Sequence, residues 1–188
     1  MTRRARRAKM ITMGVREGLT DGVVTLSPLE LADVDAHLAG EDEELAYWLN
    51  GGRGTRATVE AHIRDCVDQW SSGGPVYALA IRAGREQLAG TVEVQFNRPY
   101  LAYDEVNLSY GVYPSWRRQG IATRAVLLAC QFAAGMGAVR AVIRADVLNL
   151  ASAAVAARTG FSHRRRTLDG DTVLDWFARD LTAEDALP

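Results

Sequence analysis

The sequence of 188 residues has almost no lysine: Lys9 is the only one among 22 basic residues, and the rest are arginines. Because 23 acidic residues balance them, the net charge is −1, and the chain lacks the positive excess that a nucleic-acid-binding domain usually carries. It also lacks any run of about 18 consecutive apolar residues, which argues against a membrane-spanning helix. No apolar stretch of signal-peptide length follows the basic first residues, which argues against a secretory signal. We therefore expect neither a nucleic-acid partner nor a membrane partner.

Cysteine and histidine are scarce as well. Cys66 and Cys130 each fall within a helix-like apolar pattern, so we expect two reduced core residues, as in a cytoplasmic protein. The three histidines, His37, His62 and His163, are scattered along the chain without cysteine or carboxylate partners at the spacing of metal ligands. We therefore expect no metal site.

The composition itself is that of a globular domain, with 48% hydrophobic and 24% charged residues. Its length suits one domain that folds without disulfides or a stabilising cofactor. Residues 1–20 are rich in arginine and predict a disordered leader, with a nucleic-acid or membrane-contacting arm as the alternative. Residues 21–188 then form the single folded domain.

Two helices are predicted in the first part of this domain, after a short strand at 23–26. Ser27, Pro28 and Glu30 have the spacing of an N-cap, a first-turn proline and a capping-box glutamate, which predicts a helix from Pro28. Thr58 is a candidate cap for the second helix, whose apolar positions follow helical spacing. The acidic segment between the helices, 41–44, predicts a loop or a short helix.

From residue 76 onward the hydrophobic period becomes that of β-strands. Three β-rich runs predict consecutive antiparallel strands at 76–81, 88–96 and 106–113. A buried helix follows, then a strand at 139–147, a short helix closed by Gly160, and a final hairpin. The expected order is β-α-α-β-β-β-α-β-α-β-β.

This order defines the expected fold class: α/β (α+β), with a mixed, mostly antiparallel central sheet. The buried helix separates the strands at 106–113 and 139–147, and a crossover of this kind makes its two strands parallel neighbours. Their carboxyl ends should therefore lie near each other.

The loop between the central strand and the buried helix has the features of an anion site. Its sequence, WRRQGIATRAV (116–126), places Arg117, Arg118 and Gly120 at the first turn of the helix. Unpaired backbone N–H groups and the positive end of the helix dipole attract anions there, and a glycine lets phosphate oxygens approach the backbone. The two arginines therefore predict a cradle for a diphosphate.

On these residues the chain resembles the GNAT superfamily of N-acetyltransferases, and within it the ribosomal-protein N-terminal acetyltransferases that act on alanine or serine. Two family motifs are present: the acetyl-CoA loop R/Q-x-x-G-x-G/A, and N-x-x-S/A followed by G-F. They are matched by Arg117, Gly120 and Ala122, and by Asn149, Ser152, Gly160 and Phe161. The likeness extends from about residue 23 to residue 181.

The resemblance implies acetyl-CoA as the cosubstrate and two splayed parallel strands that hold its pantetheine arm. It implies that loop amides hold the CoA pyrophosphate. It also implies that the Val112 N–H, beside a bulge at 109–111, donates to the thioester carbonyl as a small oxyanion hole. The implied cofactor-binding residues are Val112, Arg117, Arg118, Gln119, Gly120, Ile121, Ala122, Thr123, Asn149 and Ser152.

The candidate catalytic residues are Ser152, Glu93 and Val112. An amine that attacks the thioester directly must lose a proton, and the leaving thiolate must gain one. Many relatives supply that proton from a tyrosine where this chain has Ala156, so Ser152 becomes the candidate donor to the CoA sulfur; it also fits a residue that only completes its helix turn. Glu93 is the candidate base, acting through a water, and it also fits a solvated charge on a strand face.

The acceptor is expected where this family builds its acceptor pocket, beside Glu43, Glu44, Tyr47 and Trp48. An acidic segment there attracts a cationic amine and tilts the prediction toward a basic small molecule rather than a protein N-terminus, although a solvated acidic face also fits. Asn107 completes the set, because it stands where relatives often carry a glutamate and it cannot act as a base.

The predicted function is acetyl-CoA-dependent N-acetylation of a primary amine in a ternary complex. Two alternatives stay open: a CoA-binding sensor or scaffold module without turnover, and transfer of a larger acyl group such as succinyl. The apolar last strand, with Trp176 and Phe177, is a candidate homodimer interface, and core packing accounts for these residues equally well.

Overall fold

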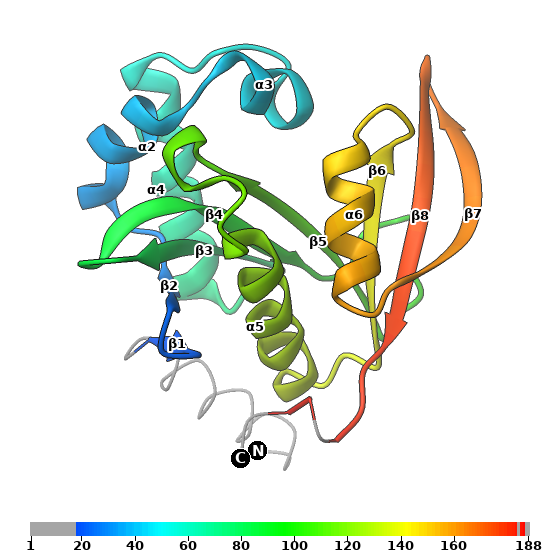
Figure 1. Ribbon diagram of the computed structural model, residues 1–188. Coiled ribbons are helices and arrows are strands. Elements are labelled where there is room, and N and C mark those ends of the chain that lie inside the picture. Colours follow the sequence, from blue (N-terminus) through cyan, green and yellow to red (C-terminus); the bar gives the residue numbers. More distant parts are fainter. Residues whose placement is uncertain (1–17, 184, 187–188) are drawn as a thin grey trace.

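A computed structural model describes residues 18–183 and 185–186, and Figure 1 shows their arrangement. This part of the chain forms one eight-stranded sheet in the order β1-β2-β3-β4-β5-β6-β8-β7. Of the leader predicted at 1–20, residues 1–17 lie outside the described range, whereas Leu19–Thr20 already form a strand. Within that range, no helix is both long and apolar enough to span a bilayer.

The elements follow the predicted succession, with the short β1 added at the start. The strands are β1 (Leu19–Thr20), β2 (Val24–Pro28), β3 (Val76–Ala83), β4 (Gln87–Gln95), β5 (Glu105–Val112), β6 (Arg140–Asp146), β7 (Ser162–Asp169) and β8 (Thr172–Asp180). The helices and helical turns are η1 (Leu31–Asp33), α2 (Val34–Gly40), α3 (Glu43–Leu45), η2 (Ala46–Asn50), α4 (Arg56–Ser72), η3 (Pro114–Trp116), α5 (Ile121–Gly135) and α6 (Leu150–Arg158).

The first helical segment begins later than predicted. Ser27 and Pro28 are the last residues of β2, where Pro28 pairs with Leu79 of β3. The N-cap is Glu30, whose N–H donates to the Asp33 carboxylate at 3.0 Å while its own side chain accepts from the Asp33 backbone. The prediction of a cap at Ser27 was wrong because pairing with β3 keeps these residues extended, so the reciprocal cap forms at the next available pair.

The second helix, α4, begins earlier than predicted. Its N-cap is Thr55, whose hydroxyl accepts the Thr58 N–H at 3.2 Å, while the Thr58 hydroxyl accepts the Thr55 N–H at 2.8 Å. Thr58 is therefore the partner in a capping box instead of the cap itself. Helical spacing then buries Ile63 and Trp70, as the periodicity predicts.

The central part of the sheet is buried on both faces, whereas the edge strand β7 is largely exposed. Tyr77, Leu79 and Ile81 of β3 belong to the core that α5 covers, whereas Ala78 and Ala80 belong to a second core under α2 and α4. Side chains alternate across a strand, so a strand buried on both faces appears in the sequence as a continuous apolar run. Figure 1 shows α5 crossing the sheet, with α6 beside β6.

Trp176, a large aromatic residue of the last strand, packs against residues of its own chain. Trp176 of β8 is only 7% exposed. The guanidinium carbon of Arg165 lies 3.9 Å from the Trp176 ring centre, and that of Arg144 lies 5.0 Å from it. Packing and cation–π contacts within one chain therefore account for Trp176.

Strands β5 and β6 are parallel neighbours, as predicted, but they pair only at their beginnings. Pairing joins residues 105–107 to residues 140–142. Beyond these residues β5 continues to Val112 and β6 continues to Asp146, with no further pairing between them in the described chain. The splayed strands implied by the resemblance are therefore present.

The predicted bulge lies on a different strand. β5 keeps an unbroken register with β4 as far as Val112, so the bulge expected at 109–111 was wrong. The irregularity falls on β4, where Ala89 is the extra residue between the partners of Ile81 and Arg82. The gap beside β5 therefore arises because β6 departs, while β5 itself stays regular.

Gly90, next to this bulge, is expected to be irreplaceable. A Cβ at Gly90 would lie 2.1 Å from the Gly111 carbonyl oxygen. Gly90→Ala should lower the free energy of unfolding by about 2–3 kcal/mol, because the clash is with backbone that cannot yield without moving β5. As a control, Gly170→Ala in the last hairpin should cost only about 1 kcal/mol of left-handed strain, since a Cβ there meets nothing within 4 Å. Urea unfolding measures both, and equal losses would contradict this account.

Candidate functional site

A groove of about 1160 Å³ opens where β5 and β6 part, and we call it the β5–β6 groove. Its walls come from the two strands, the start of α5, one side of α6 and the α3–η2 segment. Among the residues that line it are Ser109, Tyr110, Gly111, Val112, Arg118, Gly120, Asn149 and Ser152. The groove thus collects most of the residues predicted to bind the cofactor.

The Val112 N–H is directed into this groove. Tyr113 donates its N–H to the Ala89 carbonyl at 2.8 Å, and opposed residues in an antiparallel ladder alternate between bonded and non-bonded pairs. Val112, opposite Gly90, therefore turns its N–H and C=O away from β4, toward the side that β6 has left. Its carbonyl accepts from Arg117 Nε at 3.0 Å. The adjacent N–H is placed to donate to a ligand lying between the two strands.

The first turn of α5 faces the same groove. Gly120 is its N-cap, with a left-handed φ of 77°, and a Cβ there would meet no described atom within 4 Å. Arg118 also has a left-handed φ, 61°, and is exposed, while the Gln119 side chain donates back to the Ser115 carbonyl. Left-handed residues before a helix gather successive N–H groups around a concavity, and the helix dipole adds positive potential. This turn can therefore bind an anion.

Arg117 is engaged elsewhere. Its guanidinium makes two hydrogen bonds of 2.8 Å to the Asp42 carboxylate and one of 2.7 Å to Glu44. The hydrogen bonds from Arg117 lower the pKa of Asp42, so that carboxyl is ionised at neutral pH. Arg117 therefore ties the acidic segment to the end of β5. Of the two arginines in the predicted cradle, only Arg118 has no ion pair within the described residues.

The start of α6 unites two predicted residues with one that was not predicted. Asn149 is the N-cap, and its Oδ1 accepts the Ser152 N–H at 2.9 Å. The Ser152 hydroxyl lies 3.0 Å from the hydroxyl of Tyr110 on β5. Burial raises the pKa of Tyr110 to about 12, so the phenol keeps its proton at neutral pH. A phenol thus stands beside Ser152 even though α6 has Ala156 at the position of the family tyrosine.

A second cavity, of about 660 Å³, lies on the other face of β4 and β5, and we call it the polar cavity. Its floor consists of alternate residues of the two strands, which are Thr91, Glu93, Gln95, Ser109 and Gly111. The residues between them, such as Val92 and Leu108, belong to the core under α5. The two cavities meet between β5 and the α3–η2 segment, because both are lined by Ser109, Tyr110 and Gly111 of β5 and by Leu45 and Leu49.

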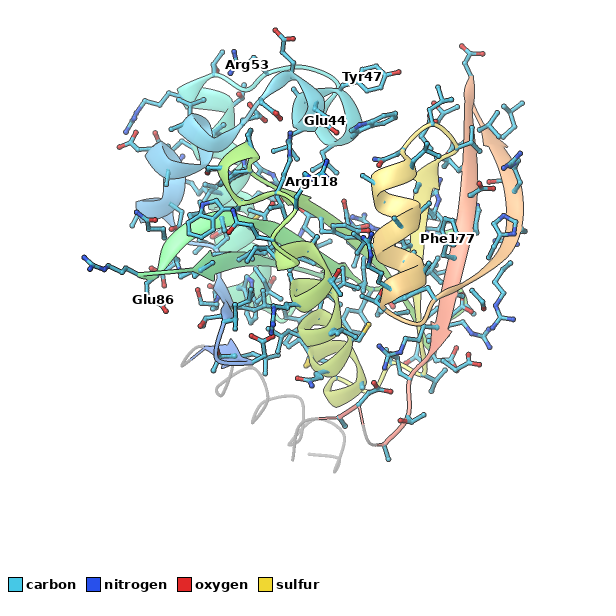
Figure 2. All side chains as sticks on the ribbon, viewed as in Figure 1. Glu44, Tyr47, Arg53, Glu86, Arg118 and Phe177 are labelled. Carbon is cyan, nitrogen blue, oxygen red and sulfur yellow. The ribbon has the colours of Figure 1, made fainter. Side chains whose placement is uncertain are left out.

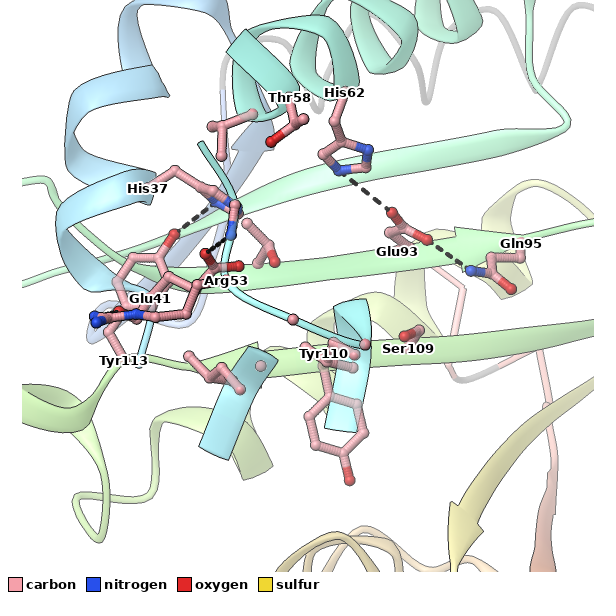
Figure 3. A pocket seen from close by; sticks show the side chains of 18 residues that line it. His37, Glu41, Arg53, Thr58, His62, Glu93, Gln95, Ser109, Tyr110 and Tyr113 are labelled. Carbon is pink, nitrogen blue, oxygen red and sulfur yellow. Dashed lines mark hydrogen bonds and ion pairs between the residues drawn. The ribbon is translucent and has the colours of Figure 1, made fainter. Parts of the chain in front are cut away.

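Glu93 lies on the floor of the polar cavity (Figure 3). Gln95 Nε2 donates to Glu93 Oε2 at 2.6 Å, and His62 Nε2 lies 4.0 Å from Glu93 Oε1. Asn107 donates to Gln95 at 3.1 Å but is itself buried and lines neither cavity, and its Oδ1 has no hydrogen-bond partner among the described residues. The predicted base is therefore held within a chain of hydrogen-bonding side chains.

The opposite wall of the polar cavity is also polar. The Tyr113 hydroxyl and His37 Nδ1 are 2.8 Å apart, and burial lowers the pKa of His37, so its ring is neutral at neutral pH. The buried Glu41 carboxylate accepts the Gly54 N–H at 2.7 Å. These groups could offer hydrogen bonds to a polar ligand, although periodicity in the sequence gave no sign that they would converge.

The residues predicted to hold the acceptor lie outside the polar cavity. Glu44, Tyr47 and Trp48 line the β5–β6 groove, and Glu43 lines neither cavity of the described chain. Tyr47 is 68% exposed and packs edge to face on Trp48, with ring centres 4.6 Å apart. Figure 2 shows Glu44, Tyr47 and Arg118 at the same end of the molecule. This segment therefore borders the predicted cofactor site.

Comparison with known families identifies the family of the chain. Residues 24–162 match the family described as the acetyltransferase (GNAT) domain. The chain belongs to the GNAT acetyltransferase family. It matches no curated protein significantly.

Solved structures share the fold of this GNAT acetyltransferase at low sequence identity. One, from Salmonella typhimurium, is an acetyltransferase that modifies the N-terminal serine of the 50S ribosomal subunit protein L7/L12. Its TM-score is 0.75, with 20% identity and coverage of 88% of this chain and 99% of that chain. RimL, a ribosomal L7/L12 α-N-protein acetyltransferase solved with coenzyme A, gives 0.72 and 19%, covering 87% and 98%. A GNAT acetyltransferase from Bacillus anthracis gives 0.73 and 13%, covering 87% and 98%.

Family membership confirms the reaction class and the fold expected from the resemblance. The protein is an N-acetyltransferase that moves an acetyl group from acetyl-CoA to an amine. The assignment of individual residues to that reaction stays a prediction, which the geometry above makes specific.

The ion pair of Arg117 should make stability depend on pH. The pKa of Asp42 is lowered in the folded state, so the pair contributes stability above the usual carboxyl range and loses it as pH falls through the lowered value. Arg117→Met should therefore lower the free energy of unfolding by about 1 kcal/mol more near neutral pH than at an acid pH where Asp42 is protonated, after allowance for partial exposure. Loss of the hydrogen bond to the Val112 carbonyl adds a cost that is the same at both pH values.

Urea unfolding of the GNAT domain at a series of pH values measures this difference. Arg118→Met is the matched control, because Arg118 is the adjacent arginine and has no ion pair within the described residues. A pH-independent difference between the wild type and Arg117→Met would show that the pair does not carry this stability.

Proposed function

We propose that the protein acetylates the α-amine of a peptide or protein N-terminus by direct attack on acetyl-CoA, with both substrates bound at once. The observation that carries this proposal is the meeting of the two cavities at Ser109, Tyr110 and Gly111. A thioester in the β5–β6 groove and an amine in the polar cavity approach each other across these residues. Holding the two reactants in contact replaces a covalent acyl-enzyme step.

The diphosphate of acetyl-CoA binds at the first turn of α5. The backbone amides of residues 119–123 are the donors, and the missing side chain of Gly120 leaves room for phosphate oxygens. Arg118 adds a positive charge at this exposed turn. Ile121 anchors the turn, because its side chain is buried in the core under α5.

Arg117 acts as a positioning residue, which differs from the predicted phosphate contact. Its Nε holds the Val112 carbonyl, and its Nη atoms hold Asp42 and Glu44. These contacts keep the end of β5 and the acidic segment in place around the cofactor groove. The Val112 N–H therefore keeps its direction although no strand pairs with β5 on that side.

The pantetheine arm lies along β5 in the place of a partner strand. An extended ligand satisfies backbone groups at an open strand edge in the same way as an added strand does. Asn149 caps α6 through Oδ1, which leaves its amide NH₂ group as the donor for pantetheine. The Val112 N–H donates to the thioester carbonyl oxygen and stabilises the negative charge that develops there.

The chemical step moves three protons. Glu93, through one water, accepts a proton from the acceptor ammonium and passes it to solvent, and the neutral nitrogen forms a C–N bond to the acetyl carbon. The nitrogen is positively charged after this attack, and it loses its second proton to the same water and Glu93. The C–S bond breaks, and the CoA thiolate takes a proton from the Ser152 and Tyr110 hydroxyl pair, which solvent later restores. Tyr110 thereby supplies the phenol that α6 lacks.

A peptide N-terminus suits the polar cavity better than a polycationic small molecule does. Arg117 offsets part of the negative charge of the acidic segment that favoured such a molecule, because it pairs with Asp42 and Glu44. The cavity volume falls within the usual range for a small ligand or a chain end. Two solved structures of the same fold belong to enzymes whose described substrate is the N-terminus of a ribosomal protein, which supports this choice.

Reversing the charge of Arg118 should weaken CoA binding. We expect Arg118→Glu to raise the Kd for CoA about 10-fold or more, because a charged contact to phosphate is lost and a repulsion is gained. The matched control is Arg85→Glu on the β3–β4 turn, an exposed arginine that does not line the β5–β6 groove. Calorimetry with CoA measures both, and an unchanged Kd for Arg118→Glu would contradict the diphosphate site.

Removing the Glu93 carboxylate should stop turnover but not cofactor binding. We expect Glu93→Gln to lower kcat by about 100-fold or more, the usual contribution of a general base, with the Kd for CoA unchanged. Glu86→Gln, the same exchange on an exposed turn, should leave kcat unchanged.

Release of the CoA thiol measures this reaction across short peptides with free N-termini, polyamines and amino-sugars. We expect the peptides with free N-termini to be the best acceptors. Tight CoA binding with no thiol release on any amine would contradict the proposal, and faster turnover with polyamines would overturn the acceptor assignment.

A further inference from the structure

Three side chains with metal-binding atoms converge beside the polar cavity. His62 and Cys66 lie one turn apart on α4, and Glu93 faces them from β4. Cys66 Sγ is 3.6 Å from His62 Nε2, and His62 Nε2 is 4.0 Å from Glu93 Oε1. All three ligand atoms lie within 4.8 Å of one another. The expectation that His62 has no cysteine or carboxylate partner is therefore wrong.

The separations are close to those that a zinc ion imposes. Bond lengths of about 2.3 Å to sulfur and about 2.0–2.1 Å to nitrogen and oxygen, at tetrahedral angles, place ligand atoms about 3.4–3.6 Å apart. The sulfur–nitrogen distance of 3.6 Å already has this value. The nitrogen–oxygen distance of 4.0 Å and the sulfur–oxygen distance, which is at most 4.8 Å, shorten through rotamer changes when an ion binds. A thiolate, an imidazole and a carboxylate form a donor set that favours zinc over magnesium or calcium.

Neighbouring side chains orient Glu93 so that one of its carboxylate oxygens can bind an ion. Gln95 holds Glu93 Oε2 at 2.6 Å, which leaves Oε1 turned toward His62 (Figure 3). Cys66 is 4% exposed and fixed in the core, whereas the His62 side chain is 49% exposed and the Glu93 side chain is 25% exposed. An ion can therefore reach the cluster from the polar cavity, and water can fill its fourth position.

We propose that His62, Cys66 and Glu93 bind Zn²⁺ and that the bound ion stops acetyl transfer by occupying the Glu93 carboxylate. On binding, the Cys66 thiol releases its proton to solvent and the thiolate coordinates the metal. The inhibitory half of this proposal rests on the proposed role of Glu93 as the base. The binding half stands on the cluster alone.

Zinc binding is tested without any acceptor. Calorimetry of reduced, chelator-treated protein with Zn²⁺ should show one ion bound per chain, and Co²⁺ should give the charge-transfer absorption of a cobalt–thiolate bond. Cys66→Ala should weaken Zn²⁺ binding by at least about 100-fold and abolish that absorption. Cys130→Ala, which removes the other buried cysteine, should change neither.

A second variant guards against misfolding, since Cys66 is in the core. His62→Gln changes a half-exposed side chain and should also weaken Zn²⁺ binding, while thermal unfolding confirms that each variant is folded. Equal Zn²⁺ affinity in the wild type and both folded variants overturns the site, whatever the protein acetylates.

Inhibition is then measured by thiol release with the best acceptor. Zn²⁺ should stop turnover by the wild type and by Cys130→Ala at concentrations that leave Cys66→Ala active, and a chelator should restore it. Zinc that binds stoichiometrically without lowering kcat overturns the regulatory half. Zinc binding that is lost in Cys66→Ala supports the site even if no amine proves to be a substrate, so failure of the proposed function is distinguishable from failure of the metal site.

Discussion

The early end of pairing between β5 and β6 is the constraint on which the rest of the site depends. The two strands are joined only at residues 105–107 and 140–142, and beyond them one edge of β5 faces a groove instead of a strand. A backbone edge inside a protein must find partners. Arg117 satisfies the Val112 carbonyl, and the N–H beside it is left for a ligand. The open edge, the first turn of α5 and the start of α6 therefore surround one space.

The two faces of β5 divide the chemistry. Tyr110 and Val112 face the core side and the groove, whereas Ser109 and Gly111 face the polar cavity. Because side chains alternate along a strand, consecutive residues of β5 face the β5–β6 groove and the polar cavity in turn. A cofactor and an acceptor bound on the two sides would therefore lie close to each other. Polar side chains on β4 continue the floor of the polar cavity, and one of them, Glu93, lies close to His62 and Cys66 of α4. The same arrangement thus creates a candidate base and a candidate metal site that exclude each other.

The sequence predicted the features that depend on local pattern and missed those that depend on distant partners. Strand and helix periodicity predicted the element order, and the glycine before α5 predicted the exposed turn at the start of that helix, whereas the anion that this turn would bind stays a prediction. Arg117 was expected at the phosphates because its partner Asp42 lies 75 residues earlier, and nothing local signals that pair. Tyr110 was missed for the same reason, since its partner Ser152 lies 42 residues later. The helix start at Pro28 failed because pairing with β3 outweighed a local cap.

Amide hydrogen exchange tests most directly whether the Val112 N–H is unbonded in the free protein and donates to the thioester carbonyl of bound acetyl-CoA. In the free protein the Val112 amide should exchange much faster than that of Tyr113, which is bonded to the Ala89 carbonyl. Acetyl-CoA should slow exchange at Val112 while leaving Tyr113 slow throughout. A Val112 amide already protected in the free protein, or unaffected by saturating acetyl-CoA, would contradict the account.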